Sequence, residues 1–564
     1  MEDTAFPATS GPEHDEARVE LERRKTEASE KHGDSIRPVT TRDDGTEYPT
    51  GIKLILIIVA LCLAVFVMAL DNSIIATAIP KITVAFNSLD DVGWYASAYL
   101  LTTAALQLFF GKLYTFLSLK WVFVTAITIF EIGSLICGVA PNSTALIVGR
   151  AIAGIGSAGI FSGALLILAN SVPLPKRPAY TGILGAMYGI ASVAGPLLGG
   201  VFTDKVTWRW CFYINLPIGA VAVGVVVLFF EEPQRKPAEL ADNTNGTAKE
   251  PFTKKLRHFD ILGTAIFIPA VISLLLALQW GGTEYAWSNG RIIGLFVVFG
   301  VLFLAFLAIQ WKAGDDATVP PRIIQKRSIY SGAIYAFGSG ASFFLFVYYI
   351  PIWFQAVQGV SAINSGIRNL PTLLSVVVFS IFSGGLVTTF GQYAPFMILG
   401  TVLMSIGAGL LTTWEPSTTT GAWVGYQILY GAGAGMGFQQ PLVAVQAVLD
   451  PADVPVGTAV MVFVQTIGGA LFTSVGQNVF SNTLVTQLVK NVPSVDPKTV
   501  IAAGAANFRH VLDANILPSV VLAYSNAITT AFIVGAALSV STVFGSVFIE
   551  WKSIKGKHIE TAGG

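Results

Sequence analysis

Long apolar runs dominate the sequence and set the class of fold that it can adopt. An α-helix rises about 1.5 Å per residue, so about 20 apolar residues cross the roughly 30 Å hydrocarbon core of a bilayer. Fourteen stretches of the 564-residue chain are long enough, near residues 52–79, 93–111, 121–140, 144–169, 182–202, 211–230, 261–279, 292–311, 330–350, 367–388, 395–412, 422–448, 456–479 and 523–549. They are unbroken rather than alternating in hydrophobicity, which excludes the strands of an outer-membrane barrel. We therefore expect an all-α polytopic membrane protein with 14 transmembrane helices.

The few charged residues lie mainly between these runs, and their signs predict the orientation. Charged residues make up 12% of the chain, whereas soluble domains average about 25%. Basic and acidic residues tie at 34 each, so there is no basic excess of the kind that nucleic-acid binding needs. With the amino terminus inside, 25 Lys and Arg fall on the cytosolic side and 7 on the other. The positive-inside rule therefore places both termini in the cytosol and makes residues 480–522 the largest outer loop.

The sequence lacks the short motifs of the common enzyme classes. It contains no GxxxxGK[ST] phosphate-binding loop and no HExxH or CxxC metal pattern. Its three cysteines, Cys62, Cys137 and Cys211, all lie in apolar runs and form no disulfide framework. We expect neither enzymatic activity nor a bound metal or cofactor.

Three of the charged residues in the apolar runs are candidates for function, because a charge there is costly and needs a partner or a function. Asp71 ends the first run and Arg150 lies near the outer end of the fourth, so the two are expected at similar depths. An acid beside a fixed cation in a low-dielectric cavity can bind and release a proton, but the two can also form a purely structural ion pair. Glu131, deep in the third run, is a second candidate for binding a proton or a cationic substrate. The alternative for Glu131 is a permanently protonated group that hydrogen-bonds a neighbouring helix.

Four motifs in the first half resemble those of one transporter family. They are LDNSIIATAIP at 70–80, LIVGRAIAGIGSA at 146–158, GIASVAGPLLGG at 189–200 and WRWCFYINLPIG at 208–219. The chain resembles the major facilitator superfamily in its fourteen-span drug:proton antiporter branch, most like fungal toxin and multidrug efflux pumps. In the third motif Gly195, Pro196, Gly199 and Gly200 match the antiporter pattern GPxxGG. The loop GKLYTFLSLK at 111–120 departs from the superfamily's GxLxDRxGRK pattern, because Thr115 stands where the pattern has Asp.

The resemblance implies two six-helix bundles with two extra helices between them. The expected domains are a disordered cytosolic tail (1–50), an N-terminal bundle (51–230), a cytosolic linker (231–260), the two extra helices (261–311), a cytosolic loop (312–329), a C-terminal bundle (330–549) and a cytosolic tail (550–564). It also links Arg150 to proton coupling, and Asp71 and Glu131 join it as proton-coupling candidates on the argument from their depth in the membrane given above.

The central path between the bundles would be lined by polar and aromatic residues. The candidates for the substrate cavity are Asn72, Tyr335, Phe343, Phe344, Tyr348, Tyr349, Gln427, Gln439 and Gln440. Many aromatics with few charges suit bulky apolar or amphipathic cargo, although aromatics in a span also face lipid or pack in the core. Aromatic residues near the ends of the spans are interpreted as interfacial anchors: Trp94, Tyr95, Trp280, Trp287, Trp311 and Tyr330.

These observations favour a secondary transporter that exports a toxin, a secondary metabolite or a drug in exchange for protons. The alternative within transport is a proton-coupled siderophore or basic amino-acid carrier, and the alternative outside transport is a membrane ligand sensor. The expected partners are the small-molecule substrate, protons and the lipid bilayer. A proton gradient would supply the energy without a cofactor. We expect a monomer in the plasma membrane, with the vacuolar membrane as the alternative.

Overall fold

The computed structural model describes residues 47–88, 91–232, 259–282, 284–493 and 495–555. Most of each expected cytosolic tail and most of the linker at 231–260 therefore lie outside the described residues. Apart from isolated bridges at residues 47, 281, 285, 392 and 553, the regular structure in the described ranges is helical. All three cysteines are free.

The helices form three consecutive groups along the chain. The first contains α2 (Gly51–Phe86), α3 (Val92–Phe116), α4 (Leu119–Val139), α5 (Ser143–Ser171), α6 (Arg177–Lys205), α7 (Trp210–Tyr213) and α8 (Asn215–Phe229). The second contains α10 (Ile261–Trp280), α11 (Gly290–Ala313) and the short α12 (Pro321–Ile324). The third contains α13 (Arg327–Gln358), α14 (Ala362–Arg368), α15 (Leu370–Phe390), α16 (Ala394–Leu411), α17 (Thr420–Gly437), α18 (Gln440–Val448), α19 (Val454–Asn491), α20 (Pro497–Val511) and α21 (Leu517–Phe548). Two 3₁₀ turns, η2 (Leu174–Lys176) and η4 (Gly314–Asp316), complete the described elements.

Twelve of the described helical segments are long and apolar enough to cross a membrane. The expected count of 14 is not reached, because α3 and α17 fall outside this set. The α3 helix carries Thr102, Thr103 and Gln107, and α17 carries Gln427 among small glycines and alanines, which lowers the hydropathy of both. The chain is thus a multi-pass, all-helical membrane protein.

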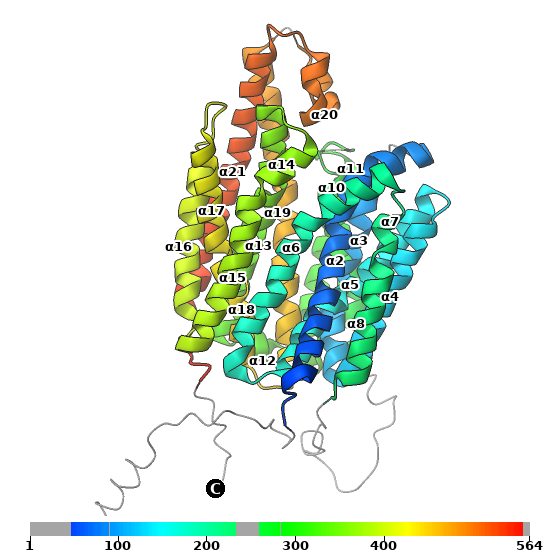
Figure 1. The fold of residues 1–564 in the computed structure, drawn as a ribbon, viewed down its shortest axis with the longest axis vertical. Coiled ribbons are helices and arrows are strands. Elements are labelled where there is room, and N and C mark those ends of the chain that lie inside the picture. The colour runs from blue at the N-terminus through cyan, green and yellow to red at the C-terminus, as the bar shows by residue number, and fades with distance from the viewer. Residues whose placement is uncertain (1–46, 89–90, 233–258, 283, 494, 556–564) are drawn as a thin grey trace, which may run out of the picture. The chain divides into compact units, whose positions relative to one another are not determined.

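The first and third helix groups meet along two seams. Within the first group α2 packs on α6 and α8, and α5 packs on α3 and α4; within the third, α13 packs on α19 and α21. The seams between the groups are formed by α6 with α15 and by α3 with α19, while α10 packs on α11 and contacts both α3 and α19. The first turn of α2 and α12 lie at one end of the helices, and α20 lies at the other (Figure 1). We call these the α12 end and the α20 end.

The hydrophobic cores are distributed unequally between the two ends. One core joins residues 57–68 of α2, 99–114 of α3 and 153–168 of α5 to residues 442–462 of α18 and α19, so it belongs to both groups. Beyond it, residues 69–82 of α2 pack in a core made from the first group alone. A separate core of the third group covers its α20 end, with Val193 of α6 packed at its edge. The helix groups therefore share a core at the α12 end and have largely separate cores toward the α20 end.

Ion pairs close the seam at the α12 end. Arg322 forms a bidentate pair with Asp453 at the start of α19, and its Nε donates to Asp315 Oδ1 at 2.7 Å. Lys112 of α3 donates to the carbonyl oxygen of Asp316 at 3.2 Å. The loop between α11 and α13 therefore ties α3 to α19. These contacts lie beside the 111–120 loop, in which Thr115 replaces the acid of the superfamily pattern.

The seam between α3 and α19 can be tested with Gly111→Ala. A Cβ at residue 111 would lie 2.6 Å from the Ala459 Cβ and 3.4 Å from the Pro455 carbonyl oxygen. We expect the free energy of unfolding to fall by about 1–3 kcal/mol, because an added methyl group overpacks a closed contact. The measurement is the Tm of the purified protein in detergent. Gly409→Ala on α16 is the control, because nothing lies within 4 Å of its added Cβ. Equal Tm values for the two variants would show that α3 and α19 do not close on each other here.

Candidate functional site

The two charged residues predicted at similar depths form a buried ion pair between α2 and α5. The side chains of Asp71 and Arg150 are both 0% exposed. Arg150 donates from Nη1 to Asp71 Oδ2, and from Nε to the Tyr95 carbonyl oxygen at 2.8 Å. The guanidinium also lies over the Tyr99 ring, 4.5 Å from its centroid. Such a pair is tolerated inside a membrane protein because further polar and aromatic contacts offset part of the cost of dehydration.

Glycines on α5 allow neighbouring helices to enclose the pair. A Cβ at Gly154 would overlap the Tyr99 carbonyl oxygen of α3, and one at Gly149 would lie 2.7 Å from the Cys137 sulfur of α4. Only glycine permits such close backbone approach. The glycines of the motif at 146–158 therefore serve packing around Arg150.

Asp71 has a second partner that the sequence analysis missed. Asn215, at the first residue of α8, is fully buried, and its Nδ2 donates to Asp71 Oδ1 at 3.1 Å. The same Nδ2 lies 3.2 Å from Ser134 Oγ of α4. Asn215 therefore joins α2 to α4 through α8. The available signal was the motif at 208–219, which contains this asparagine.

Tyr95 is not an interfacial anchor, contrary to its interpretation from the sequence. It is 0% exposed, and its hydroxyl forms hydrogen bonds with Ser143 Oγ at 2.9 Å and Ser88 Oγ at 2.6 Å. Its position near a helix end suggested an interface, but the neighbouring ends of α2 and α5 cover it. In contrast, Trp287, Trp311 and Tyr330 are partly exposed.

Glu131 lies on α4 with its carboxyl group buried. Both carboxyl oxygens are buried, and neither has a hydrogen-bond partner among the described residues. The carboxyl lies against Gly219 of α8, where an added Cβ would overlap Glu131 Oε1. An unpaired buried carboxylate is costly, so this position suits a group that binds a proton or a cation.

The aromatic cavity candidates Phe343 and Phe344 lie together on α13. Their ring centroids are 5.7 Å apart, and Phe343 also contacts Phe438, at the end of α17, with centroids 5.2 Å apart. Phe343 is buried and Phe344 is half-buried. Asn72, next to Asp71, hydrogen-bonds Tyr188 of α6. These side chains place aromatic surface on the third group and an amide near the ion pair.

The two tyrosines at 348–349 point to different surroundings. Tyr349 is fully buried, and its hydroxyl donates to Gln477 Oε1 of α19 at 3.0 Å. Tyr348 is 50% exposed. Tyr349 therefore serves the contact between α13 and α19, whereas Tyr348 keeps a free surface.

The remaining polar candidates, Tyr335, Gln427, Gln439 and Gln440, are all buried. The Oε1 atoms of Gln439 and Gln440 and the Nε2 of Gln427 have no hydrogen-bond partner among the described residues. Gln439 lies on the seam between the groups, because its amide faces Gly185 of α6. Unpaired buried amides are rare in proteins, which makes this set a candidate for contact with cargo.

The GPxxGG motif lies on α6 and packs against α2 just beyond Asp71. A Cβ at Gly195 would overlap the Ser73 hydroxyl oxygen, and one at Gly199 would meet the next turn of α2 equally closely. Pro196 lies inside the helix, and Gly200 faces open space. The motif therefore fixes how α6 contacts the turn of α2 that follows the ion pair.

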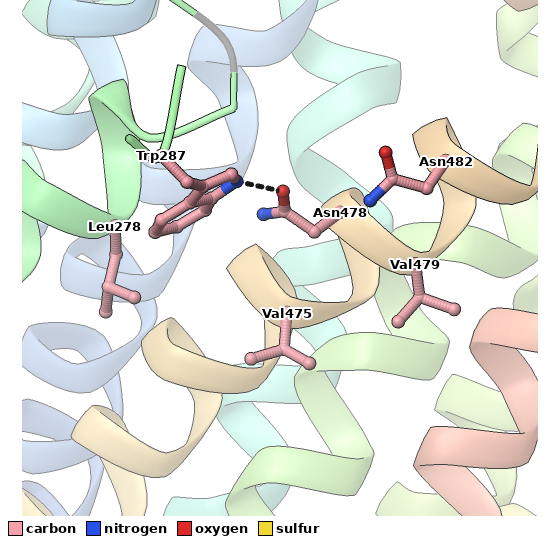
Figure 2. Close-up of a pocket in the computed structure, with 6 residues that line it drawn as sticks. All are labelled: Leu278, Trp287, Val475, Asn478, Val479 and Asn482. Atoms are coloured by element: carbon pink, nitrogen blue, oxygen red, sulfur yellow. Dashed lines mark hydrogen bonds between the residues drawn. The ribbon is translucent and has the colours of Figure 1, made fainter. Parts of the chain in front are cut away.

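A pocket of about 340 Å³ lies between the end of α10 and α19 (Figure 2). Six uncharged residues line it: Leu278, Trp287, Val475, Asn478, Val479 and Asn482. The Trp287 Nε1 donates to Asn478 Oδ1 at 2.5 Å, which ties the α10–α11 connection to α19. Within the described residues, no group of three or more His, Cys, Asp or Glu could hold a metal ion.

Known proteins with similar sequences are transporters. The profile of the Major Facilitator Superfamily matches residues 61–473. The chain is 58% identical over 513 residues to the MFS-type efflux pump MFS1 of Trichophyton rubrum, covering 91% of this chain and 94% of that one. It is 52% identical over 513 residues to the efflux pump aflT of Aspergillus parasiticus, covering 91% and 98%.

A solved structure has a similar fold. The crystal structure of the human organic anion transporter MFSD10 aligns with a TM-score of 0.55 and 12% identity, covering 87% of this chain and 100% of that one. The resemblance to fungal efflux pumps expected from the motifs is confirmed, and so is the expectation that the chain is not an enzyme. The chain belongs to the Major Facilitator Superfamily of membrane transporters.

Proposed function

We propose that this protein exports a small organic molecule in exchange for protons by alternating access. The observation that carries the proposal is the buried Asp71–Arg150 pair, an acid and a fixed cation isolated from solvent between two helices. Relatives that share more than half of the sequence are named efflux pumps, which supports the direction of transport.

We further propose fourteen membrane-spanning helices, with both termini in the cytosol and the plasma membrane as the location. The two additional spans are α3, which packs along α5 and α19, and α17, which packs along α15 and α16. The α12 end would face the cytosol, since it carries Lys53, Lys112, Arg322, Lys326 and Arg327. The energy source would be the proton gradient, and the transporter would act as a monomer.

The shared core at the α12 end suggests which state this conformation represents. With that end in the cytosol, the path is closed inward and the outer halves of the helix groups are free to separate. A proton from outside binds the Asp71 carboxylate and releases it from Arg150. The groups then reopen toward the cytosol, where Asp71 loses the proton and cargo binds before the return.

Cargo would bind on the third helix group, where rings and amides converge. Phe343 and Phe438 supply apolar surface, and Gln439 Oε1, which has no partner among the described residues, supplies a hydrogen-bond acceptor at the seam. None of these three side chains is charged, which suits a bulky neutral molecule. A second candidate, a basic amino acid or another cationic cargo, is favoured by one observation: the unpaired Glu131 carboxyl.

Asp71→Asn tests proton exchange. The amide keeps the size of the side chain but, unlike a carboxyl group, does not take up and release a proton during the transport cycle. Dye accumulation driven by an acid interior in proteoliposomes should therefore fall by about tenfold or more. The probes are rhodamine 6G and the uncharged dye Nile red. Exchange of labelled for unlabelled dye at equal pH needs no net proton movement and should continue.

The matched control for this test is Asp204→Asn, the same change at an exposed position at the end of α6. It should behave like the unmodified protein. If Asp71→Asn lowers only the Tm and accumulates dye normally, the ion pair is structural and the proton-coupling proposal fails.

Gln439→Leu tests the cargo site. Removing one hydrogen-bonding amide should raise the KM for a dye that binds there by about five- to tenfold, with the maximal rate less affected. Gln325→Leu, the same change at an exposed position outside the spans, is the control. An unchanged KM for both dyes would remove Gln439 from the cargo site.

A further inference from the structure

The motif at residues 208–219 resembles a family pattern but has no role in the mechanism described so far. It forms the end of the α6–α7 connection, α7 and the start of α8. Its first half is attached to the end of α4: Arg209 Nη1 donates to the carbonyl oxygens of Gly138 and Ala140, each at 2.9 Å. The Tyr213 hydroxyl donates to the same Gly138 oxygen at 2.8 Å. The segment therefore satisfies carbonyl groups that a helix end leaves unpaired.

Aromatic packing fixes the segment to the end of α2 as well. The Arg209 guanidinium lies over the Trp208 ring, 4.5 Å from its centroid. Trp208 is buried and contacts Phe86, in the last turn of α2, with ring centroids 5.6 Å apart. The segment is thus held between the ends of α2 and α4, the helices that carry Asp71 and Glu131.

Two contacts inside the bundle continue this attachment. Asn215 bridges Asp71 Oδ1 and Ser134 Oγ, at 3.1 and 3.2 Å. Gly219 follows Asn215 by four residues, and Glu131 precedes Ser134 by three, so each lies one helical turn away. The contact between Gly219 and Glu131 therefore lies one helical turn along α4 and α8 from the contact between Asn215 and Ser134. Both acids are held through neighbouring turns of α8.

Asn215 also has an unused acceptor. Its Oδ1 is buried and has no hydrogen-bond partner among the described residues, while its Nδ2 donates to the Asp71 carboxyl group. An amide can donate to a carboxylate and, after rotation by half a turn, accept from a carboxylic acid. Arg150 can only donate. Asn215 is therefore able to remain a partner of Asp71 in both protonation states.

We propose that Asn215 and Gly219 are positioning residues for proton coupling, which hold Asp71 and Glu131 in register across α8. This inference rests on the proposed proton exchange. When a proton from outside binds Asp71, its new O–H donates to Asn215 Oδ1, and the Arg150 contact is released. Gly219 leaves the space that the Glu131 carboxyl occupies one turn away.

Several other titratable groups surround Asp71 and belong to the same electrostatic environment. They are Tyr99 on α3, Glu131 and Cys137 on α4, Arg150 on α5 and Cys211 on α7. Neither Asn215 nor Gly219 titrates, so their replacement changes geometry and hydrogen bonding without changing the number of charges.

Asn215→Leu is the first test, in proteoliposomes with rhodamine 6G and Nile red. Loss of the amide should lower dye accumulation driven by an acid interior by about tenfold or more, because Asp71 loses its second partner. Dye-for-dye exchange at equal pH should stay within about twofold of the unmodified protein. Normal proton-driven accumulation, or an equal fall in both activities, would overturn the positioning role.

Gly219→Ala is the second test and does not depend on the folding of the first variant. Its Cβ displaces the Glu131 carboxyl, whereas Gly224→Ala on the same helix meets nothing within 4 Å. Proton-driven accumulation should fall in Gly219→Ala alone. The added methyl should also lower the Tm, and in a Glu131→Ala background, which removes the clash, Gly219→Ala should lower the Tm no further; a full additional fall in Tm there would overturn the contact on which the proposal rests.

Failure of this inference and failure of the proposed function give different results. If the unmodified protein accumulates neither dye in a pH gradient, proton-coupled export fails and the positioning role fails with it. If the unmodified protein accumulates dye and both variants do so equally well, the export function stands and only the role of Asn215 and Gly219 is rejected.

Discussion

The cost of burying Asp71 and Arg150 is the constraint on which the first helix group depends. Two charges removed from water must recover several kcal/mol each through mutual attraction and further hydrogen bonds. Arg150 donates a hydrogen bond to the Tyr95 carbonyl oxygen and lies over the Tyr99 ring. Asp71 accepts a hydrogen bond from Asn215. One Arg150 atom, Nη2, has no hydrogen-bond partner among the described residues. The pair is therefore supported well enough to persist but not saturated, which agrees with the opening of the pair in the proposed transport cycle.

Close helix packing is the second condition for such a pair, because water would otherwise screen it. Gly149 and Gly154 let α4 and α3 approach α5 around Arg150, and Gly195 lets α6 approach α2 beyond Asp71. Side chains at these positions would separate the helices and admit water. The glycine-rich motifs and the intramembrane charges are thus parts of one arrangement, although they lie far apart in the sequence.

The sequence predicted the charged centre better than its neutral surroundings. Counting residues from the ends of apolar runs placed Asp71 and Arg150 at similar depths, because a helix has a fixed rise. Asn215 and Ser134 were not predicted as site residues, because neutral polar residues are common in spans and their partners depend on how each helix is rotated about its axis. The same dependence misplaced Tyr95, which lies near a helix end but faces inward. The fourteen expected spans also include α3 and α17, which fall outside the twelve segments apolar enough to cross a membrane, because buried polar and small residues lower their hydropathy.

The α6 helix links the charged centre to the cargo seam. Its Gly195 packs on Ser73, two residues after Asp71, while its Gly185 packs on Gln439 and its Gly182 on the Ser380 carbonyl of α15. A shift of α2 that follows release of Arg150 must therefore move α6 or open the Ser73 contact. At these contacts no flexible side chain of α6 lies between the helices that could absorb a shift of α2. Movement of α6 together with α2 therefore costs less than distortion of either helix backbone. Under the proposed proton exchange, movement at Asp71 would be transmitted to the seam where the amide of Gln439 lies, which would give the GPxxGG motif a mechanical role in addition to its packing role.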